Sequence, residues 1–267
     1  MRFQVLVLST LFLISCASPK KAETPVAAAK TISSQHLLAG TVWFQSASET
    51  RALFYQGYNM AKMSLDLELK KKSDKKRAVV VDIDETVIDN SPYQAKLILE
   101  NLGYPDHWSE WIDSEKGIAL PGSLEFLTYA DKKGVEVFYI SNRKPNQLKQ
   151  TINNLKKLGF PLRGESNVLL QDAESNKTIR REKVSATHNI VLLVGDNLND
   201  FTGLYEKKSV AERKDITDKL KNEFGTKYIM LPNPMYGDWE GAILDYYKTK
   251  LNEEEKDAKR KSYLRSF

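Results

Sequence analysis

The chain has few of the residues that build disulfides or soft-metal sites. It contains one cysteine, Cys16, and three histidines, His36, His107 and His188, in 267 residues. A single cysteine excludes a disulfide within the chain, and no cluster of Cys and His offers the ligands of a zinc site. The basic residues are scattered and are not interleaved with aromatic residues. Nucleic acid is therefore not an expected partner.

The chain also lacks a hydrophobic run long enough to cross a bilayer. Residues 1–15 carry Arg2 and an apolar run at 5–14, which is the pattern of a secretory signal peptide. The run ends in Leu-Ile-Ser-Cys at 13–16, which resembles a bacterial lipobox, in which cleavage exposes a cysteine that carries a lipid. The alternative is an ordinary signal peptide with an incidental cysteine. We expect an exported protein anchored through Cys16, with a flexible tether at 16–34 rich in Ala, Lys, Ser, Thr and Pro.

The most informative stretch that is present is RAVVVDIDETVIDN at 77–90. Its apolar, β-branched run at 78–81 predicts a strand buried on both faces. Asp82 and Asp84 follow directly. Because alternate residues of an extended segment point the same way, we expect both carboxylates to project together from the end of this strand. The alternative is an ordinary turn of acidic residues after a strand. This stretch alone does not distinguish that turn from a functional site, whereas later segments of the chain do.

The remaining pattern alternates between strands and helices. Apolar runs predict further strands at 135–140, 167–170, 189–194 and 228–231, and helical spacing predicts helices at 35–72, 121–134 and 145–159. This alternation indicates right-handed crossovers and a parallel sheet with helices on both faces. We expect the main domain to span 35–250, with cap elements from 35–72 and 91–120, and a charged tail at 251–267.

Polar residues follow these strands at the edge where open α/β sheets bind ligands. They are Asp82, Asp84, Ser141, Lys177, Asp196 and Asp200. Carboxylate oxygens suit Mg²⁺, and a metal-free cluster of carboxylates would repel itself. A hydroxyl and an ammonium suit the oxygens of a transferring phosphoryl group, and an aspartate can be its nucleophile. The pattern therefore favours phosphoryl transfer.

These residues resemble the four motifs of the haloacid dehalogenase (HAD) superfamily. The motifs are Asp-Ile-Asp-Glu-Thr at 82–86, Ser141, Lys177, and Gly-Asp at 195–196 with Asp200. The sequences SNR at 141–143, GDNLNDF at 195–201 and LPNPMYG at 231–237 are similar to the class C acid phosphatases, bacterial lipoproteins that act as 5′-nucleotidases. The lipobox, the long N-terminal helix and the two tryptophans at 108 and 111 are similar as well. The resemblance implies a Rossmann-like α/β fold with a small helical cap.

The resemblance also implies a role for each residue of the catalytic centre. Asp82 attacks phosphorus, and Asp84 protonates the leaving oxygen and then takes a proton from water. Mg²⁺ is held by Asp82, by the backbone carbonyl of Asp84 and by Asp196, while Asp200 fixes waters or Lys177. Ser141, Asn142 and Lys177 bind the phosphoryl group.

A flat ring of the substrate, a base or nicotinamide, would stack on Tyr236 and on an aromatic residue from the insertion, Trp108 or Trp111. The implied activity is Mg²⁺-dependent hydrolysis of phosphomonoesters, 5′-nucleotides or nicotinamide mononucleotide. By resemblance to Gram-negative lipoproteins, Ser18, two residues after the cysteine, favours the outer membrane.

Other functions stay open at this point. The same fold could serve a phosphotransferase or a broad phosphomonoesterase. A different class is a surface lipoprotein that binds haem, for which the three histidines are the available ligands, although no Cys-x-x-Cys-His motif is present. The preferred ester, the pH optimum, the face of the membrane and the oligomeric state, a homodimer among the options, do not follow from the sequence.

Overall fold

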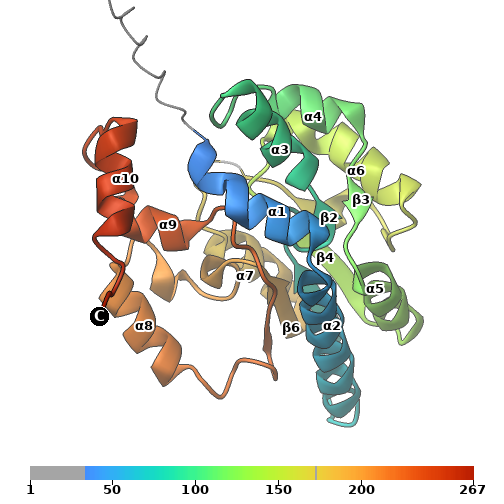
Figure 1. Ribbon diagram of the computed structural model, residues 1–267. Helices are drawn as coiled ribbons and strands as arrows, with labels where there is room; N and C mark the ends of the chain where they lie inside the picture. The colour runs from blue at the N-terminus through green and yellow to red at the C-terminus, as the bar shows by residue number, and fades with distance from the viewer. Residues whose placement is uncertain (1–33, 172) are drawn as a thin grey trace, which may run out of the picture. The chain divides into compact units, whose positions relative to one another are not determined.

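A five-stranded parallel sheet forms the centre of the computed structural model, which describes residues 34–171 and 173–267 (Figure 1). The expected signal peptide, Cys16 and the tether up to residue 33 lie outside the described residues. The strand order is β5-β4-β1-β6-β7. The strands are β1 (Lys76–Val81), β4 (Glu136–Ile140), β5 (Val168–Leu169), β6 (His188–Gly195) and β7 (Tyr228–Met230). All five strands overlap the ranges predicted from the apolar runs, and every pairing between them is parallel.

Strand β1 is the topological centre of the sheet. The chain adds β4 and then β5 on one side of β1, and afterwards returns to add β6 and β7 on the other side. The order therefore reverses at β1, between β4 and β6. In open α/β sheets the crevice at the carboxyl end of such a switch point is where ligands bind.

Helices cover both faces of this sheet, as the alternation predicts. Helices α2 (Ser48–Leu69), α5 (Ser123–Lys132) and α6 (Leu148–Lys157) lie on one face, where Val79 and Val81 of β1 join the larger core cluster. Helix α7 (Thr178–Thr187) lies on the other face with Ala78 and Val80. Alternate residues of one strand thus enter two cores, which explains why the run is continuously apolar.

The N-terminal helix is broken once. A 3₁₀ turn at Gln35–Leu37 leads into α1 (Leu38–Ser46), and α2 begins at Ser48 after Ala47 takes an extended conformation. The predicted aromatic face is buried, with Phe54 and Tyr58 in the core. Helix α1 lies close to the loop after β7, because a Cβ at Gly40 would stand 2.7 Å from the carbonyl oxygen of Pro234. This part of the chain therefore supports a loop at the carboxyl edge of the sheet.

The insertion after β1 is a small, mostly helical unit. It contains α3 (Ser91–Glu100) and α4 (Trp108–Ser114), and its ends are joined by an antiparallel pair of two-residue strands, β2 (Ile88–Asp89) and β3 (Ile118–Ala119). In Figure 1 it lies above the sheet beside α1. The insertion is thus held at the same edge as the polar residues that follow β1.

The C-terminal region continues past the expected end of the main domain. It contains α8 (Val210–Lys219), α9 (Asp238–Ile243), a 3₁₀ turn at Asp245–Tyr247 and α10 (Glu253–Lys261). Shorter 3₁₀ turns lie at Pro145–Gln147, Glu165–Asn167, Leu198–Asp200 and Gly203–Tyr205. Arg260 of α10 donates to Glu240 of α9 at 2.7 Å, so the charged tail is a docked helix. Across the described ranges, every helix is too short or too polar to cross a bilayer.

Candidate active site

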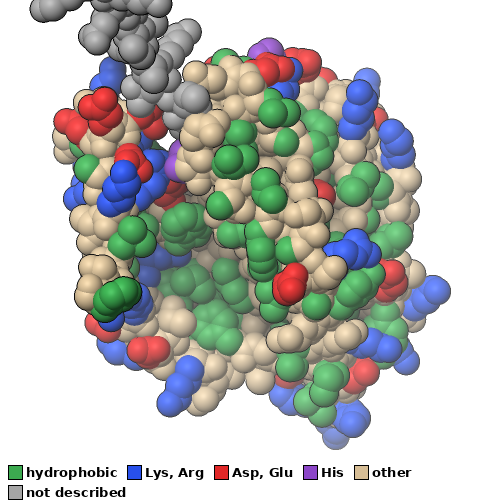
Figure 2. Space-filling view, viewed as in Figure 1, with side chains coloured by type: hydrophobic (Ala, Val, Ile, Leu, Met, Phe, Trp, Pro, Cys, Tyr) green, Lys and Arg blue, Asp and Glu red, His purple; other side chains and the backbone are tan. Residues whose placement is uncertain are grey.

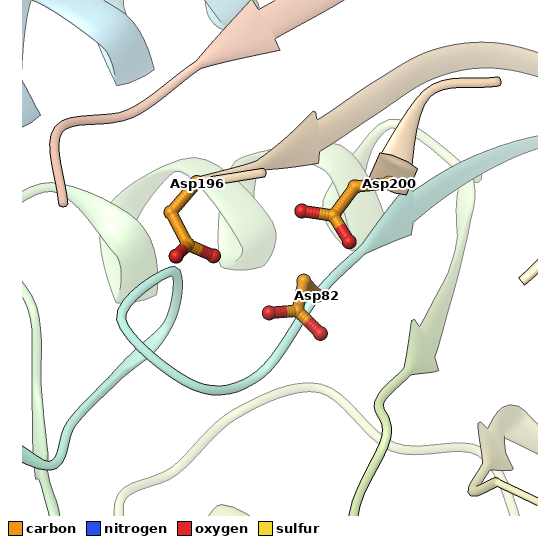
Figure 3. A group of neighbouring side chains, drawn as sticks. All are labelled: Asp82, Asp196 and Asp200. Atoms are coloured by element: carbon orange, nitrogen blue, oxygen red, sulfur yellow. The ribbon is translucent and has the colours of Figure 1, made fainter. Parts of the chain in front are cut away.

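Three carboxylates converge at the carboxyl edge of the sheet. Asp82 follows β1, Asp196 follows β6, and Asp200 ends a 3₁₀ turn after β6. Each offers an oxygen atom, and these oxygens all lie within 4.8 Å of one another. Figure 3 shows the three side chains pointing toward one common point. Asp82 and Asp200 are buried, 8% and 7% exposed, so the repulsion between them is weakly screened.

One buried cation balances part of this charge. Lys177 is the residue before α7, and its Nζ lies 2.7 Å from Oδ1 of Asp200 and also contacts Asp82. Burial alone would lower the pKa of Lys177, but the carboxylates of Asp200 and Asp82 outweigh burial and raise it. The ammonium therefore stays charged, and the group as a whole keeps an excess of negative charge.

Burial and the excess negative charge together raise the pKa values of two acids of this group, Asp82 and Asp196. Burial raises the pKa of Asp82 well above its ordinary value, and the neighbouring carboxylates add to this rise while Lys177 opposes it. Burial and Asp200 raise the pKa of Asp196 to about 7, against hydrogen bonds from Asn233 and Thr86. Keeping all these acids ionised is therefore costly without a metal, and a bound cation would favour their ionised forms.

Two hydrogen bonds orient Asp196. Thr86 Oγ1 donates to its Oδ1 at 3.1 Å, and Asn233 Nδ2 donates to its Oδ2 at 2.8 Å. Sequence reasoning did not single out either residue, although Thr86 closes the DIDET motif and Asn233 lies between two prolines. The close packing here requires glycine at 195, where a Cβ would stand 2.3 Å from Oδ2 of Asp200. The glycine of the Gly-Asp motif is thus required because the side chain of Asp200 leaves no room for a Cβ atom at position 195.

Asp84 has different surroundings. Its Oδ1 accepts from Arg143 Nε at 2.9 Å and Nη2 at 2.7 Å, and from Asn90 Nδ2 at 2.9 Å. Its Oδ2 accepts from Ser141 Oγ at 3.0 Å. Arg143 is 3% exposed and Asn90 is fully buried, so these donors are fixed in place. Both were missed from the sequence, where Arg143 stands in the SNR motif and Asn90 ends the 77–90 stretch.

The sequence predicted that Asp82 and Asp84 would project together; both line the same cavity, but their side chains have different partners. Strand β1 ends at Val81 and the chain bends at Ile83, between the two aspartates, so the alternation of an extended strand does not continue through the motif. The compact group of side-chain carboxylates is Asp82, Asp196 and Asp200. The Asp84 side chain faces the donors described above, which leaves its backbone carbonyl as the group expected to reach a metal.

The expected phosphate-binding residues lie around the same point. Ser141 follows β4 and contacts Asp84, and Asn142 lines the same cavity as Lys177 and the carboxylates. Arg180 of α7 ties this loop down by donating to the carbonyl of Ser141 and to Oδ1 of Asn142, each at 2.6 Å. Lys177 thus contacts Asp82, and Ser141, which is itself fully buried, contacts Asp84, so both lie beside the two aspartates of the motif.

A cavity of about 950 Å³ opens above this floor. Its wall includes aromatic side chains of the insertion and of the loop after β7, which are Tyr93, Tyr104, Trp108 and Tyr236. Residues of α9 and α10 complete its rim, and Figure 2 shows the surface hollowed between the α8–α10 side and helix α1. Trp108 packs edge-on against Tyr93, with ring centroids 5.0 Å apart. The cavity is large enough for a flat ring beyond a phosphate.

The second tryptophan of the insertion has another role in the described structure. Trp111 is not among the residues that line the cavity; its indole nitrogen donates to Oδ1 of Asn90 at 2.7 Å. Of the two expected stacking tryptophans, Trp108 is therefore the one in position. The docked tail was not expected either, because a run of mixed charge carries little signal of what it packs against.

The residues at this edge fit a divalent cation. Three carboxylates and one ammonium leave an uncompensated negative charge, all donors are hard oxygens, and each carboxylate keeps an oxygen within reach of the common point. Sites of this kind bind Mg²⁺ or a similar ion through one or two carboxylates, waters and substrate phosphate. An oxygen-rich floor beside fixed donors and an ammonium is suited to phosphoryl transfer.

Comparison with known proteins agrees with this chemistry. Residues 6–239 match the model of the HAD superfamily, subfamily IIIB (acid phosphatase). The class C acid phosphatase from Bacillus anthracis is similar over 89% of this chain and 100% of its own, with 49% identity and a TM-score of 0.85. A structure of that enzyme with tungstate bound gives 48% identity and a TM-score of 0.84.

Two plant proteins are more distant relatives. The stem 31 kDa glycoprotein of Glycine max is 26% identical over 59% of this chain, and vegetative storage protein 1 of Arabidopsis thaliana is 27% identical over 62%. The matched regions span 58% and 57% of those proteins, so the chain covers little more than half of their length. The chain belongs to the acid phosphatases of HAD subfamily IIIB, a family of phosphomonoesterases that use a divalent metal.

Proposed function

We propose that this protein is a Mg²⁺-dependent acid phosphatase that hydrolyses phosphomonoesters of nucleosides or of nicotinamide riboside. The observation that carries the proposal is the cluster of Asp82, Asp196, Asp200 and Lys177, of which all but the half-buried Asp196 are buried, on the floor of a cavity with aromatic walls. Tungstate, found in the related Bacillus anthracis enzyme, is a tetrahedral oxyanion of the same shape as phosphate. This likeness supports an oxyanion site in the present chain.

The mechanism follows from the two aspartates of the motif. An oxygen of Asp82 attacks phosphorus while the bond to the leaving oxygen breaks, and Asp84 gives that oxygen a proton. The resulting aspartyl-phosphate is hydrolysed by a water whose proton returns to Asp84. Lys177, Ser141 and Asn142 hold the phosphoryl oxygens.

The metal site would use the carboxylates of Asp82 and Asp196 and the backbone carbonyl of Asp84. Asp200 pairs with Lys177 at 2.7 Å and would also fix waters bound at this site. When bound, Mg²⁺ offsets the charge of these carboxylates and of the phosphoryl group. The charge excess of the described cluster supports this assignment, and oxygen ligands favour Mg²⁺ over softer ions.

Selection of a ring-bearing substrate rests on Tyr236. Asn233 Oδ1 accepts from the backbone N–H of Met235 at 3.0 Å and of Tyr236 at 3.4 Å, while Asn233 Nδ2 donates to Asp196. One side chain thus fixes both the loop that carries Tyr236 and a carboxylate of the floor. A ring held on this loop would have a defined distance from the reacting phosphate. Stacking on Tyr236, with Trp108 on the insertion side, is our proposed basis of selectivity.

The decisive test is phosphate release by a soluble protein lacking residues 1–33, with and without Mg²⁺. The panel comprises nucleoside monophosphates, nicotinamide mononucleotide, glycerol phosphate and sugar phosphates. Tyr236→Ala should lower kcat/KM for nucleoside monophosphates by roughly 5- to 150-fold, because base–aromatic stacking is worth ~1–3 kcal/mol. Glycerol phosphate has no ring and should be nearly unaffected. Equal loss on both substrates would mean that Tyr236 supports the fold instead.

The cellular location is a separate proposal, resting on the lipobox at 13–16. We expect Cys16 to carry a lipid that anchors the protein, with the outer membrane as its site. Cys16→Ser should abolish incorporation of radiolabelled palmitate and release the protein from the membrane fraction. Equal labelling of the wild type and the Cys16→Ser variant would refute the anchor.

The haem-binding alternative finds no support in the described contacts. His36, His107 and His188 each contact a different carboxylate, of Glu240, Glu110 and Glu136 respectively. These pairs stand on separate elements of the fold. The phosphatase reading accounts for the buried charges at the sheet edge, and haem binding does not.

A further inference from the structure

A buried polar chain connects the insertion to Asp84. Trp111 of α4 donates from its indole nitrogen to Oδ1 of Asn90 at 2.7 Å, and Asn90 donates from Nδ2 to Oδ1 of Asp84 at 2.9 Å. Asn90 is fully buried, and its own backbone N–H donates to Glu85 Oε1 at 2.8 Å. Both ends of the Asn90 side chain and its backbone are therefore fixed at once.

The indole decides which end of the Asn90 amide faces Asp84. A tryptophan nitrogen can only donate a hydrogen bond, whereas an amide has one accepting end and one donating end. The accepting oxygen of Asn90 must therefore face Trp111, which leaves the NH₂ group for Asp84. If the indole were absent, the amide could turn over and offer its oxygen to a protonated Asp84.

The consequence for Asp84 is that its two oxygens are unequal. Oδ1 accepts from Asn90 and twice from Arg143, whose guanidinium cannot become an acceptor. A proton on Oδ1 would point at these three N–H donors. Oδ2 accepts only from Ser141 Oγ among the described contacts, and a hydroxyl can rotate to become the acceptor. A proton on Asp84 is thus directed to Oδ2.

We propose that Asn90 and Trp111 are positioning residues that keep the catalytic proton of Asp84 on Oδ2, the oxygen that serves the leaving group. The proposal rests on the general-acid role of Asp84 in the proposed function. In the first step the proton passes from Oδ2 to the bridging oxygen as the phosphorus–oxygen bond breaks and Asp82 bonds to phosphorus. Asp84 is left as a carboxylate, ready to accept a proton from water in the second step.

The effect of such positioning depends on the leaving group. Glycerol phosphate must expel an alkoxide, which needs the proton, whereas p-nitrophenyl phosphate expels a stabilised phenolate, which needs it far less. The quantity to compare is kcat/KM, because it covers only the steps up to loss of the first product. It therefore isolates the acid role of Asp84 from its later role as a base.

The experiment measures kcat/KM of Trp111→Phe and Asn90→Ala for both substrates. We expect Trp111→Phe to lose roughly 3- to 10-fold on glycerol phosphate, the worth of one hydrogen bond, and Asn90→Ala to lose more. Loss on p-nitrophenyl phosphate should be small in both. The ratio of the two values is taken on one sample, so a misfolded fraction cancels. Trp239→Phe, an exposed tryptophan on α9, is the matched control and should keep the wild-type ratio.

Asp84→Asn separates failure of this proposal from failure of the mechanism. If Asp84→Asn selectively loses glycerol phosphate but Trp111→Phe and Asn90→Ala lose both substrates equally or neither, the positioning role is wrong and the general acid stands. If Asp84→Asn itself loses both substrates equally, the acid role is wrong and the positioning role falls with it. Selective loss in all three variants supports the proposal.

Discussion

Asp82 and Asp84 are separated by a single residue, yet their surroundings differ sharply. Asp82 lies among the carboxylates of Asp196 and Asp200 with one ammonium, and its side chain is 9% exposed. Asp84 faces the donors of Arg143, Asn90 and Ser141, and its side chain is 18% exposed. The floor around Asp82 is rich in negative charge and suited to a cation. The surroundings of Asp84 instead fix the direction of one carboxyl group.

This contrast explains how one short motif can carry two kinds of chemistry. Two acids with the same intrinsic properties take different roles when their environments differ. We call the surroundings of Asp82, with Asp196, Asp200 and Lys177, the crowded half of the site, and the surroundings of Asp84, with Arg143, Asn90 and Ser141, the donor-rich half. The crowded half is suited to bind a metal beside the nucleophile. The donor-rich half orients the group that transfers a proton. Changes in the two halves should therefore have different consequences.

The largest difference should come from the matched substitutions Asp82→Asn and Asp84→Asn. An amide at 82 cannot attack phosphorus, so turnover should disappear with every substrate. An amide at 84 removes general acid–base catalysis, a loss of typically ~10²–10⁴-fold. The measurement is phosphate release at saturating Mg²⁺, with circular dichroism to check folding. Substantial turnover by folded Asp82→Asn protein would overturn the assignment of the nucleophile.

Lys177→Met should come next, because it removes the single ammonium found among the described carboxylates of the crowded half. Removing one partner of a buried ion pair typically costs ~3–5 kcal/mol, so urea unfolding should show a lower free energy of unfolding in the absence of metal. Excess Mg²⁺ should recover part of the loss, since the cation replaces some of the missing charge.

The control for this variant is Lys208→Met. Lys208 pairs with Glu212 at 3.1 Å on the exposed surface, where such pairs are worth ~0–1 kcal/mol. If the two lysine variants are equally stable, the buried charge balance at the sheet edge is not what we infer. If Mg²⁺ stabilises Lys177→Met no more than the wild type, the cation does not bind at this group.

The same contrast shows what could be predicted from the sequence. The crowded half was accessible, because β1, β4 and β6 are short apolar runs and parallel strands bring their carboxyl ends to one edge. That argument needs only the order of strands, so Asp82, Ser141, Lys177, Asp196 and Asp200 could be placed together before any side-chain geometry was known. The five strands and the helical character of the N-terminal segment followed from the same patterns, although the break at Ala47 did not.

The donor-rich half could not be predicted in this way. The side chain of Asp84 was expected to share the surroundings of Asp82 because both were assigned to one extended segment, whereas the chain bends at Ile83 between them. Arg143 and Asn90 are ordinary polar residues by composition, and their value lies in contacts across loops. The docking of α10 through Arg260 likewise depends on one ion pair with Glu240 that no periodic pattern announces.

The smallest predicted effect concerns the pH dependence of stability in the metal-free protein. The folded pKa of Asp196 is about 7, against 3.8 for the ordinary carboxyl group, and the pKa of Asp82 is raised in the same direction. Between these values the folded state holds a proton that the unfolded state has lost. The stability that Asp196 contributes is therefore present at low pH and falls as pH rises toward 7, by about 1.4 kcal/mol per pH unit for one proton. The raised pKa of Asp82 acts in the same direction.

The measurement is the melting temperature at about pH 5.5 and about pH 7.5, in chelator and in excess Mg²⁺. Metal-free protein should melt several degrees lower at the higher pH, since 1 kcal/mol corresponds to roughly 2–4 °C for a chain of this size. Bound Mg²⁺ requires deprotonated carboxylates, so it should flatten this dependence. Burial lowers the pKa of His36, so this group makes the protein more stable as pH rises, which opposes the effect of Asp196. Because Asp196→Asn keeps His36, comparing this variant with the wild type isolates the contribution of Asp196. If metal-free Asp196→Asn shows the same change of melting temperature with pH as the wild type, Asp196 does not hold the proton. The repulsion among the carboxylates would then be weaker than their distances indicate.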